Sequence, residues 1–166
     1  AEEQVRRLAT LYPAGRATTL IGAVAREARV KRDAGRYRVL HFATHGVLDD
    51  GNPLYSALLL AGGPDKSAAA GAAGAAAGGT DDGRLEAREL MEIPLAADLV
   101  VLSACETARG RIGAGEGVVG LSWALLLAGS ANTVVSQWKV DAGSTSELMV
   151  GFHRALRRAP SVAPAI

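Results

Sequence analysis

The stretch LVVLSACETARG, residues 99–110, joins the most strand-like segment of the chain to its single cysteine, Cys105. The overlapping segment ADLVVLSA, residues 97–104, is largely apolar, which is typical of a strand buried on both faces of a sheet. A polar run containing glycine follows directly. Binding and catalytic side chains are often found in loops at strand ends. Cys105 therefore has the position expected of a functional residue in a parallel sheet.

Helix-like and strand-like segments alternate along the rest of the chain. Apolar residues at helical spacing predict helices over 3–11, 18–30, 82–95, 117–129 and 144–158. Strands are predicted over 37–43, 54–62, 97–104 and 131–141, with a loop over 44–53. This alternation predicts an α/β fold with a mostly parallel sheet and helices on both faces. The helix over 117–129 is apolar nearly all round, so we expect it to be buried.

Composition indicates one ordinary globular domain. The chain has 166 residues, is 49% hydrophobic and 21% charged, and carries a net charge of +1. That balance gives no indication of nucleic-acid binding or of an anionic membrane surface. One cysteine excludes an internal disulfide and any zinc site built on paired cysteines, and a cytoplasmic location is expected. The sequence shows no signal peptide and no apolar run near the ~20 residues of a membrane span.

Residues 62–80, GGPDKSAAAGAAGAAAGGT, are a low-complexity Gly/Ala segment. It has little to bury and a high entropic cost of ordering, so we interpret it as a flexible insertion. The segment interrupts one domain spanning residues 1–166 rather than separating two domains. Neither end of the chain shows an obvious boundary element, so we expect a fragment of a longer protein.

The three histidines have different predicted roles. His45, in ATHG, follows the first strand and shares the expected catalytic edge of the sheet with Cys105. A free thiol is mostly protonated at neutral pH, and a neighbouring imidazole can accept its proton or stabilise the ion pair. His41 lies inside the strand and is predicted to be structural, whereas His153 is predicted to lie on the surface of the last helix.

Five segments, in this order, resemble the CHAT family of bacterial caspase-like cysteine peptidases, which are often attached to TPR repeats. They are YRVLHFATHG (37–46), LYSALLL (54–60), LVVLSACETARG (99–110), GEGVVGLSWALLLAGSANTVVSQWKVD (115–141) and ELMVGFHRAL (147–156). The resemblance implies a caspase-like three-layer α/β/α sandwich. This chain departs from the family pattern at Ala142, where a second acidic residue is common, and in its long Gly/Ala segment.

The resemblance also implies a mechanism. Cys105 is the expected nucleophile, and His45 is the general acid/base that protonates the leaving amine. The backbone N–H groups of Gly46 and Cys105 are the expected oxyanion hole. A side chain at Gly46 would crowd the scissile carbonyl, and the turn there could require positive φ.

Substrate-binding residues follow from the same resemblance. Ser136, Gln137 and Trp138 are expected to line the S1 pocket, with Asp141 at its rim, and Ser56 contributes from the second strand's side. Two alternatives stay open: Trp138 as core packing, and Asp141 as a cap of the last helix. Ser144 and Glu147 also have the spacing of a capping box.

The implied partners are a protein or peptide substrate and a regulatory TPR or other sensor region in the full-length protein. No cofactor, metal, nucleic acid or membrane is expected. The alternative from another functional class is a catalytically inactive caspase-like interaction module.

Three further alternatives fit the sequence poorly. GEGVVG, 115–120, matches the dinucleotide-binding pattern, but its first glycine follows the strand by about ten residues instead of directly. Ser122 in GLSWA lies inside a helical pattern and not at a strand-to-helix turn. His41, His45 and Cys105 do not match a zinc-ligand spacing.

Overall fold

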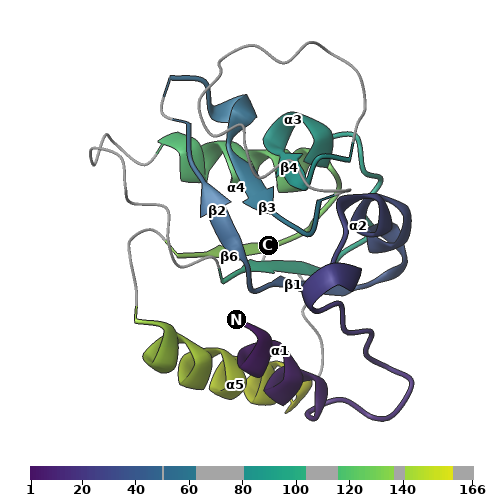
Figure 1. The fold of residues 1–166 in the computed structure, drawn as a ribbon. Helices are drawn as coiled ribbons and strands as arrows, with labels where there is room; N and C mark the ends of the chain where they lie inside the picture. The colour runs from purple at the N-terminus through teal and green to yellow at the C-terminus, as the bar shows by residue number, and fades with distance from the viewer. Residues whose placement is uncertain (50, 63–80, 104–115, 137–140, 159–166) are drawn as a thin grey trace.

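A computed structural model describes residues 1–49, 51–62, 81–103, 116–136 and 141–158, with the backbone alone for 116–119. The prediction of a flexible segment over 62–80 lies outside the described residues except at Gly62. Within the described chain, helices and strands form a mixed α/β fold around a parallel sheet (Figure 1). The predicted fold class, a caspase-like α/β/α arrangement, is confirmed, although the sheet is small.

The parallel sheet contains β1 (Val39–Phe42), β5 (Leu99–Leu102) and β6 (Thr133–Val135) in the order β1-β5-β6. Phe42 pairs with Leu102, and Leu102 pairs with Val135. All four residues of β5 are buried, as its continuous apolar run predicts. The three strands therefore end together at one edge of the sheet.

A second, antiparallel sheet contains β2 (His45–Val47), β3 (Ala57–Leu59) and β4 (Arg84–Glu86) in the order β2-β3-β4. Two sequence predictions are wrong here, because β2 lies in the expected loop over 44–53 and β4 in the expected helix over 82–95. Strands of three residues are too short to show a period of two. Only α3 (Ala87–Leu90) is helical in the latter region, and reciprocal bonds between Glu86 and Glu89 cap it.

The helix predicted over 18–30 is also only partly present. A 3-10 turn, η1 (Gly22–Val24), precedes α2 (Glu27–Asp33), and Gly22 has a φ of +58°, a conformation that favours glycine. Two further 3-10 turns, η2 (Ala34–Arg36) and η3 (Pro53–Tyr55), lead into β1 and β3. The predicted helix is therefore interrupted near Gly22, whose backbone has the left-handed conformation.

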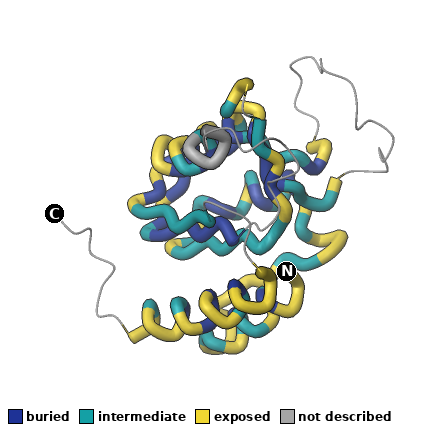
Figure 2. Tube along the Cα trace, turned by 90° about the vertical axis from the view of Figure 1, so that its left-hand side faces the viewer, coloured by how far each residue is buried: buried dark blue, intermediate teal, exposed yellow. Residues whose placement is uncertain are grey.

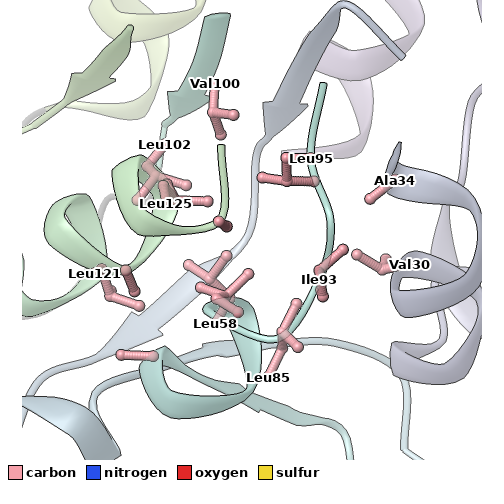
Figure 3. Packing of buried hydrophobic residues seen from close by; sticks show 14 of the residues in the cluster. Val30, Ala34, Leu58, Leu85, Ile93, Leu95, Val100, Leu102, Leu121 and Leu125 are labelled. Carbon is pink, nitrogen blue, oxygen red and sulfur yellow. The ribbon is translucent and has the colours of Figure 1, made fainter. Parts of the chain in front are cut away.

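The two faces of the parallel sheet have separate hydrophobic cores. Val100 and Leu102 of β5 belong to the larger core, which they share with side chains of α2, α3, α4 and the second sheet (Figure 3). Leu99 and Val101 point to the other face and pack with Met149, Val134 and Phe152. Alternation along one strand thus supplies both cores.

Helix α4 (Glu116–Leu127) covers the larger core with Leu121, Ala124 and Leu125. Its other apolar side chains are exposed: Trp123 is 59% and Leu127 54% accessible. The prediction of a helix buried all round is therefore wrong within the described chain, because neighbouring elements cover only one stripe.

The opposite layer consists of α1 (Glu2–Ala9) and α5 (Ala142–Arg158), which contact each other beneath the sheet (Figure 1). Their outer faces are exposed and their inner faces are partly buried (Figure 2). An ion pair at 2.6 Å joins Arg7 of α1 to Glu147 of α5 at the surface.

A partly buried charged cluster consists of Glu27, Lys31 and Glu89. Lys31 Nζ lies 2.5 Å from Glu27 Oε1 and 2.9 Å from Glu89 Oε1. Glu27 has no accessible surface, and its Oε2 accepts a hydrogen bond from the Gly83 N–H at 2.9 Å. The cluster therefore ties α2 to α3 and to the start of β4.

Candidate functional site

The two strands that precede the predicted catalytic residues end next to each other at the carboxyl edge of the parallel sheet. Phe42 and Leu102 are register partners, and the Ser103 N–H donates to the Phe42 carbonyl at 2.8 Å. His45 and Cys105 each follow the paired residue of their own strand by three positions. Neighbouring strands lie about 4.8 Å apart, so β1 and β5 end side by side at Phe42 and Leu102.

His45 is the first residue of β2, and its side chain is exposed. It pairs with Leu59 in the antiparallel register, and the Thr44 hydroxyl donates to the Leu59 carbonyl. These contacts fix the backbone that carries the imidazole and leave the ring accessible to solvent.

Gly46 is buried and pairs with Leu58. It lies in the extended backbone of β2 and is not among the glycines with positive φ, so that part of the prediction is wrong. The expected crowding of the scissile carbonyl by a larger side chain stays a prediction.

Three predicted site residues, Cys105, Gln137 and Trp138, lie outside the described residues. Ser136 is described, and it is half-buried directly after β6, at the same edge as the ends of β1 and β5. Ser136 therefore follows β6 at the edge where β1, which precedes His45 in the chain, and β5 also end.

Ser56 is completely buried, and its Oγ accepts a hydrogen bond from the Asp49 N–H at 3.0 Å. Asp49 in turn accepts hydrogen bonds from the backbone N–H groups of Gly51 and Asn52, both at 2.9 Å. Ser56 thus holds the loop after β2 through its hydrogen bond to Asp49, and its side chain has no surface that a substrate could contact.

Asp141 acts as the cap of α5. Its Oδ2 accepts hydrogen bonds from the Ser144 N–H at 2.8 Å and from the Ser144 hydroxyl at 3.0 Å. The bond from the backbone N–H, followed by that from the hydroxyl, lowers the pKa of the carboxyl. Of the two roles that the sequence left open, capping is the one with visible contacts, and Asp141 rather than Ser144 supplies the cap.

A chain of buried polar side chains beneath the same edge was not predicted. The Gln4 amide Nε2 lies 3.2 Å from His41 Nε2 and donates to Ser103 Oγ at 3.0 Å. His41 Nδ1 lies 3.1 Å from His153 Nε2, and His153 Nδ1 lies 2.7 Å from the Tyr12 hydroxyl. We call Gln4, Ser103, His41, His153 and Tyr12 the histidine chain.

The predicted surface position of His153 is wrong, since this residue is only 2% exposed. The sequence feature that indicates this burial is the spacing of four residues between Met149 and His153, which places both on the inner face of α5. Burial, followed by repulsion from His153, lowers the pKa of His41 to about 4, and burial lowers the pKa of His153.

A cavity of about 940 Å³ lies between α1, the segment 13–22, α2 and the outer edge of β1. It extends along β1 to Thr44, and His41, His153 and Tyr12 line part of its wall. Across the described ranges, no three histidine, cysteine or acidic side chains are grouped so as to hold a metal ion. No helix in the described part of the chain has the length and apolarity to cross a membrane.

Two comparisons with known proteins gave matches to this chain. Mouse tetratricopeptide repeat protein 28 is 35% identical to this chain over 72 residues, which are 43% of the chain and 3% of that protein. The chain thus spans a small fraction of this relative's length. The model of the CHAT domain, a caspase-like and peptidase-related family, matches residues 1–166. The chain therefore belongs to the CHAT domain family.

Proposed function

We propose that this chain is the catalytic domain of a cysteine endopeptidase, with Cys105 as nucleophile and His45 as general acid/base. The observation that carries the proposal is the equal three-residue offset of both residues from the register pair Phe42–Leu102. An offset of this kind directs two side chains to the same edge of a parallel sheet, where active sites gather. Family membership supports a peptidase-related domain over the dinucleotide-binding, serine-hydrolase and zinc-site alternatives.

The reaction would run in two steps. The Cys105 sulfur attacks the peptide carbonyl, and the oxyanion accepts hydrogen bonds from the N–H groups of Gly46 and Cys105. His45 protonates the leaving amine as the C–N bond breaks and a thioester remains. Water, deprotonated by His45, then hydrolyses the thioester and regenerates the thiol. The exposure of His45 suits proton exchange with solvent and substrate.

Ser136, Gln137 and Trp138 are proposed to contact the substrate, because they follow β6 at the same edge. Asp141 is assigned a supporting role, since its carboxylate already accepts two hydrogen bonds at the start of α5. Ser56 supports the loop after β2. We further propose that residues 1–166 form one domain, that the reduced thiol acts in the cytoplasm, and that TPR repeats regulate the full-length protein, as the mouse relative's name suggests.

A peptide-library cleavage screen of the full-length protein tests the assignment. Wild-type protein is expected to cleave a subset of peptides, and Cys105→Ala and His45→Ala are expected to abolish cleavage. Ser122→Ala is the matched control, because Ser122 is the alternative nucleophile in the sequence, and it is expected to leave cleavage intact. Cleavage that survives Cys105→Ala would contradict the mechanism.

Alkylation by iodoacetamide separates the peptidase from the inactive interaction module. An enzyme is expected to show Cys105 labelling that is faster than that of a free thiol and that slows in His45→Ala. Labelling at the free-thiol rate in both proteins, with no cleaved peptide in the screen, would favour the interaction module.

A further inference from the structure

The hydrogen bonds of the histidine chain define the protonation state of both rings. An amide nitrogen only donates, so His41 Nε2 must accept from Gln4 and its proton must lie on Nδ1. His41 Nδ1 then donates to His153 Nε2, and His153 Nδ1 donates to the Tyr12 hydroxyl. Every contact is satisfied when both rings are neutral. An additional proton places two donors face to face at one of these contacts.

The surroundings offer no charge that would favour an imidazolium. On α5, Arg157 lies over the Tyr12 ring at 5.7 Å, and a second cation near the chain disfavours further positive charge. Three ion pairs hold other charged groups of these elements: Glu2 with Arg6 on α1, Arg7 with Glu147 between α1 and α5, and Arg38 with Asp98 just before β1 and β5. The remaining charged side chains of α1 and α5, those of Glu3, Arg154 and Arg158, are exposed to solvent. Among the described residues, no carboxylate contributes to the pKa of either histidine.

The histidine chain crosses the interface between the sheet and the α1/α5 layer. His41 is in β1 and Ser103 directly follows β5, whereas Gln4 is on α1 and His153 on α5. The apolar core of this interface is small, with Leu99, Val101 and Met149 as its buried members. We therefore expect polar contacts to contribute a larger share of the packing of the α1/α5 layer than of the packing of α4, which lies on the larger core.

We propose that the histidine chain is an acid-sensitive latch, which holds the α1/α5 layer on the sheet at neutral pH and weakens that hold as pH falls to 5. The cavity beside β1 gives protons and water a route to both rings. A histidine that ionises at about 4 when docked and at about 6.5 when released favours the released state at pH 5 by roughly 30-fold over pH 8. Protonation of His153 acts in the same direction. The inference does not depend on catalysis by Cys105.

Hydrogen–deuterium exchange measured between pH 8 and pH 5, with correction for the intrinsic exchange rate, tests the latch. Protection of amides in α1 and α5 is expected to fall by roughly 30-fold or more across this range. Amides in β3 and in residues 121–128 are expected to keep their protection. The double variant His41→Gln/His153→Asn is expected to show little change in α1 and α5 between the two pH values.

Arg7→Gln is the matched control, because the Arg7–Glu147 ion pair joins the same two helices and stays charged in this range. It is expected to lower protection of the layer equally at both pH values. The proposal is overturned if wild-type α1 and α5 keep their protection at pH 5, if all segments lose it together, or if the double variant retains the pH step. NMR titration of the wild-type imidazoles covers the case in which the double variant does not fold, and a pKa near 6.5 for both rings would also overturn the latch.

Discussion

The charged cluster and the histidine chain both bury titratable side chains between secondary-structure elements, but they do so in opposite states of charge. In the charged cluster, burial acts to lower the pKa of Lys31, and its hydrogen bonds to Glu27 and Glu89 outweigh that effect and raise it. In the histidine chain, burial lowers the pKa of His41 to about 4, and no anionic partner opposes it. Hydrogen-bond partners therefore decide the charge state at Lys31 and His41, whereas burial outweighs the hydrogen bonds of Glu27 and raises the pKa of its carboxyl.

The two arrangements also differ in how they fail. Removal of one ion from a buried cluster leaves its partner charged and unpaired, which costs several kcal/mol. Removal of one neutral donor leaves an unsatisfied acceptor, which costs less. The charged cluster should thus be sensitive to mutation, and the histidine chain to pH.

The largest effect is expected for Lys31→Met, which leaves Glu27 and Glu89 in the charged cluster without their cation. We expect the free energy of unfolding to fall by about 3 kcal/mol, as measured by urea denaturation at pH 7. Lys31→Arg is the matched control and should lose less than half as much. The additional change Glu27→Gln should recover part of the loss, and a Lys31→Met protein of wild-type stability would show that the cluster is dispensable.

Acid should act on the histidine chain with the next largest effect. The folded-state pKa of His41 lies below its unfolded value of about 6.5, so its contribution to stability is complete above pH 6.5 and is lost as pH falls toward about 4. Wild type should lose about 2 kcal/mol more than His41→Gln between pH 8 and pH 5 in urea denaturation. Parallel stability curves for the two proteins would contradict this expectation.

Gln4→Leu tests the neutral contacts directly. Its loss leaves His41 Nε2 and Ser103 Oγ without their donor, and we expect the protein to be destabilised by about 1–2 kcal/mol at pH 7. Gln4→Glu introduces an acceptor that a protonated His41 can bind, so the pKa of His41 should rise in an NMR titration. A stability loss in Gln4→Leu as large as in Lys31→Met would remove the distinction between the two clusters.

The smallest effect is expected at Asp141, which is charged like the first cluster but exposed to water. Asp141→Ala removes the acceptor of the Ser144 N–H and should cost about 1 kcal/mol at pH 7. Asp141→Asn should retain most of the stability, since its side-chain oxygen can still cap α5. Thermal unfolding of the three proteins measures the difference, and equal melting temperatures would assign the cap no energetic role.

Long, strongly patterned segments were predictable from the sequence. The apolar run of β5 and the amphipathic stripe of α5 led to the right elements, and their alternation led to the right fold class. β1 and β5 end as register partners, and His45 and Cys105 follow these ends by the same number of residues along the chain. Whether the dyad assembles stays a prediction.

Short elements and long-range polar contacts were not predictable. β2 and β4 have three residues each and gain their stability from pairing with β3, which no local pattern encodes. The histidine chain joins residues 41 and 153, and no local pattern indicates that these residues lie close together. Exposed Trp123 was missed because an apolar helix predicts burial without saying how many of its sides are covered.

The junction between β3 and β4 has a consequence for chain length. The Leu60 N–H donates to the Gly83 carbonyl at 2.8 Å, and a Cβ on Gly83, whose φ is +86°, would lie 2.8 Å from the Gly62 backbone. The backbone at the end of β3 and the backbone just before β4 therefore lie side by side, and Gly62 and Gly83 tolerate this close approach. Because the entropy of closing a loop changes only slowly with its length, this junction is a permissive site for grafting foreign peptides or for trimming the domain.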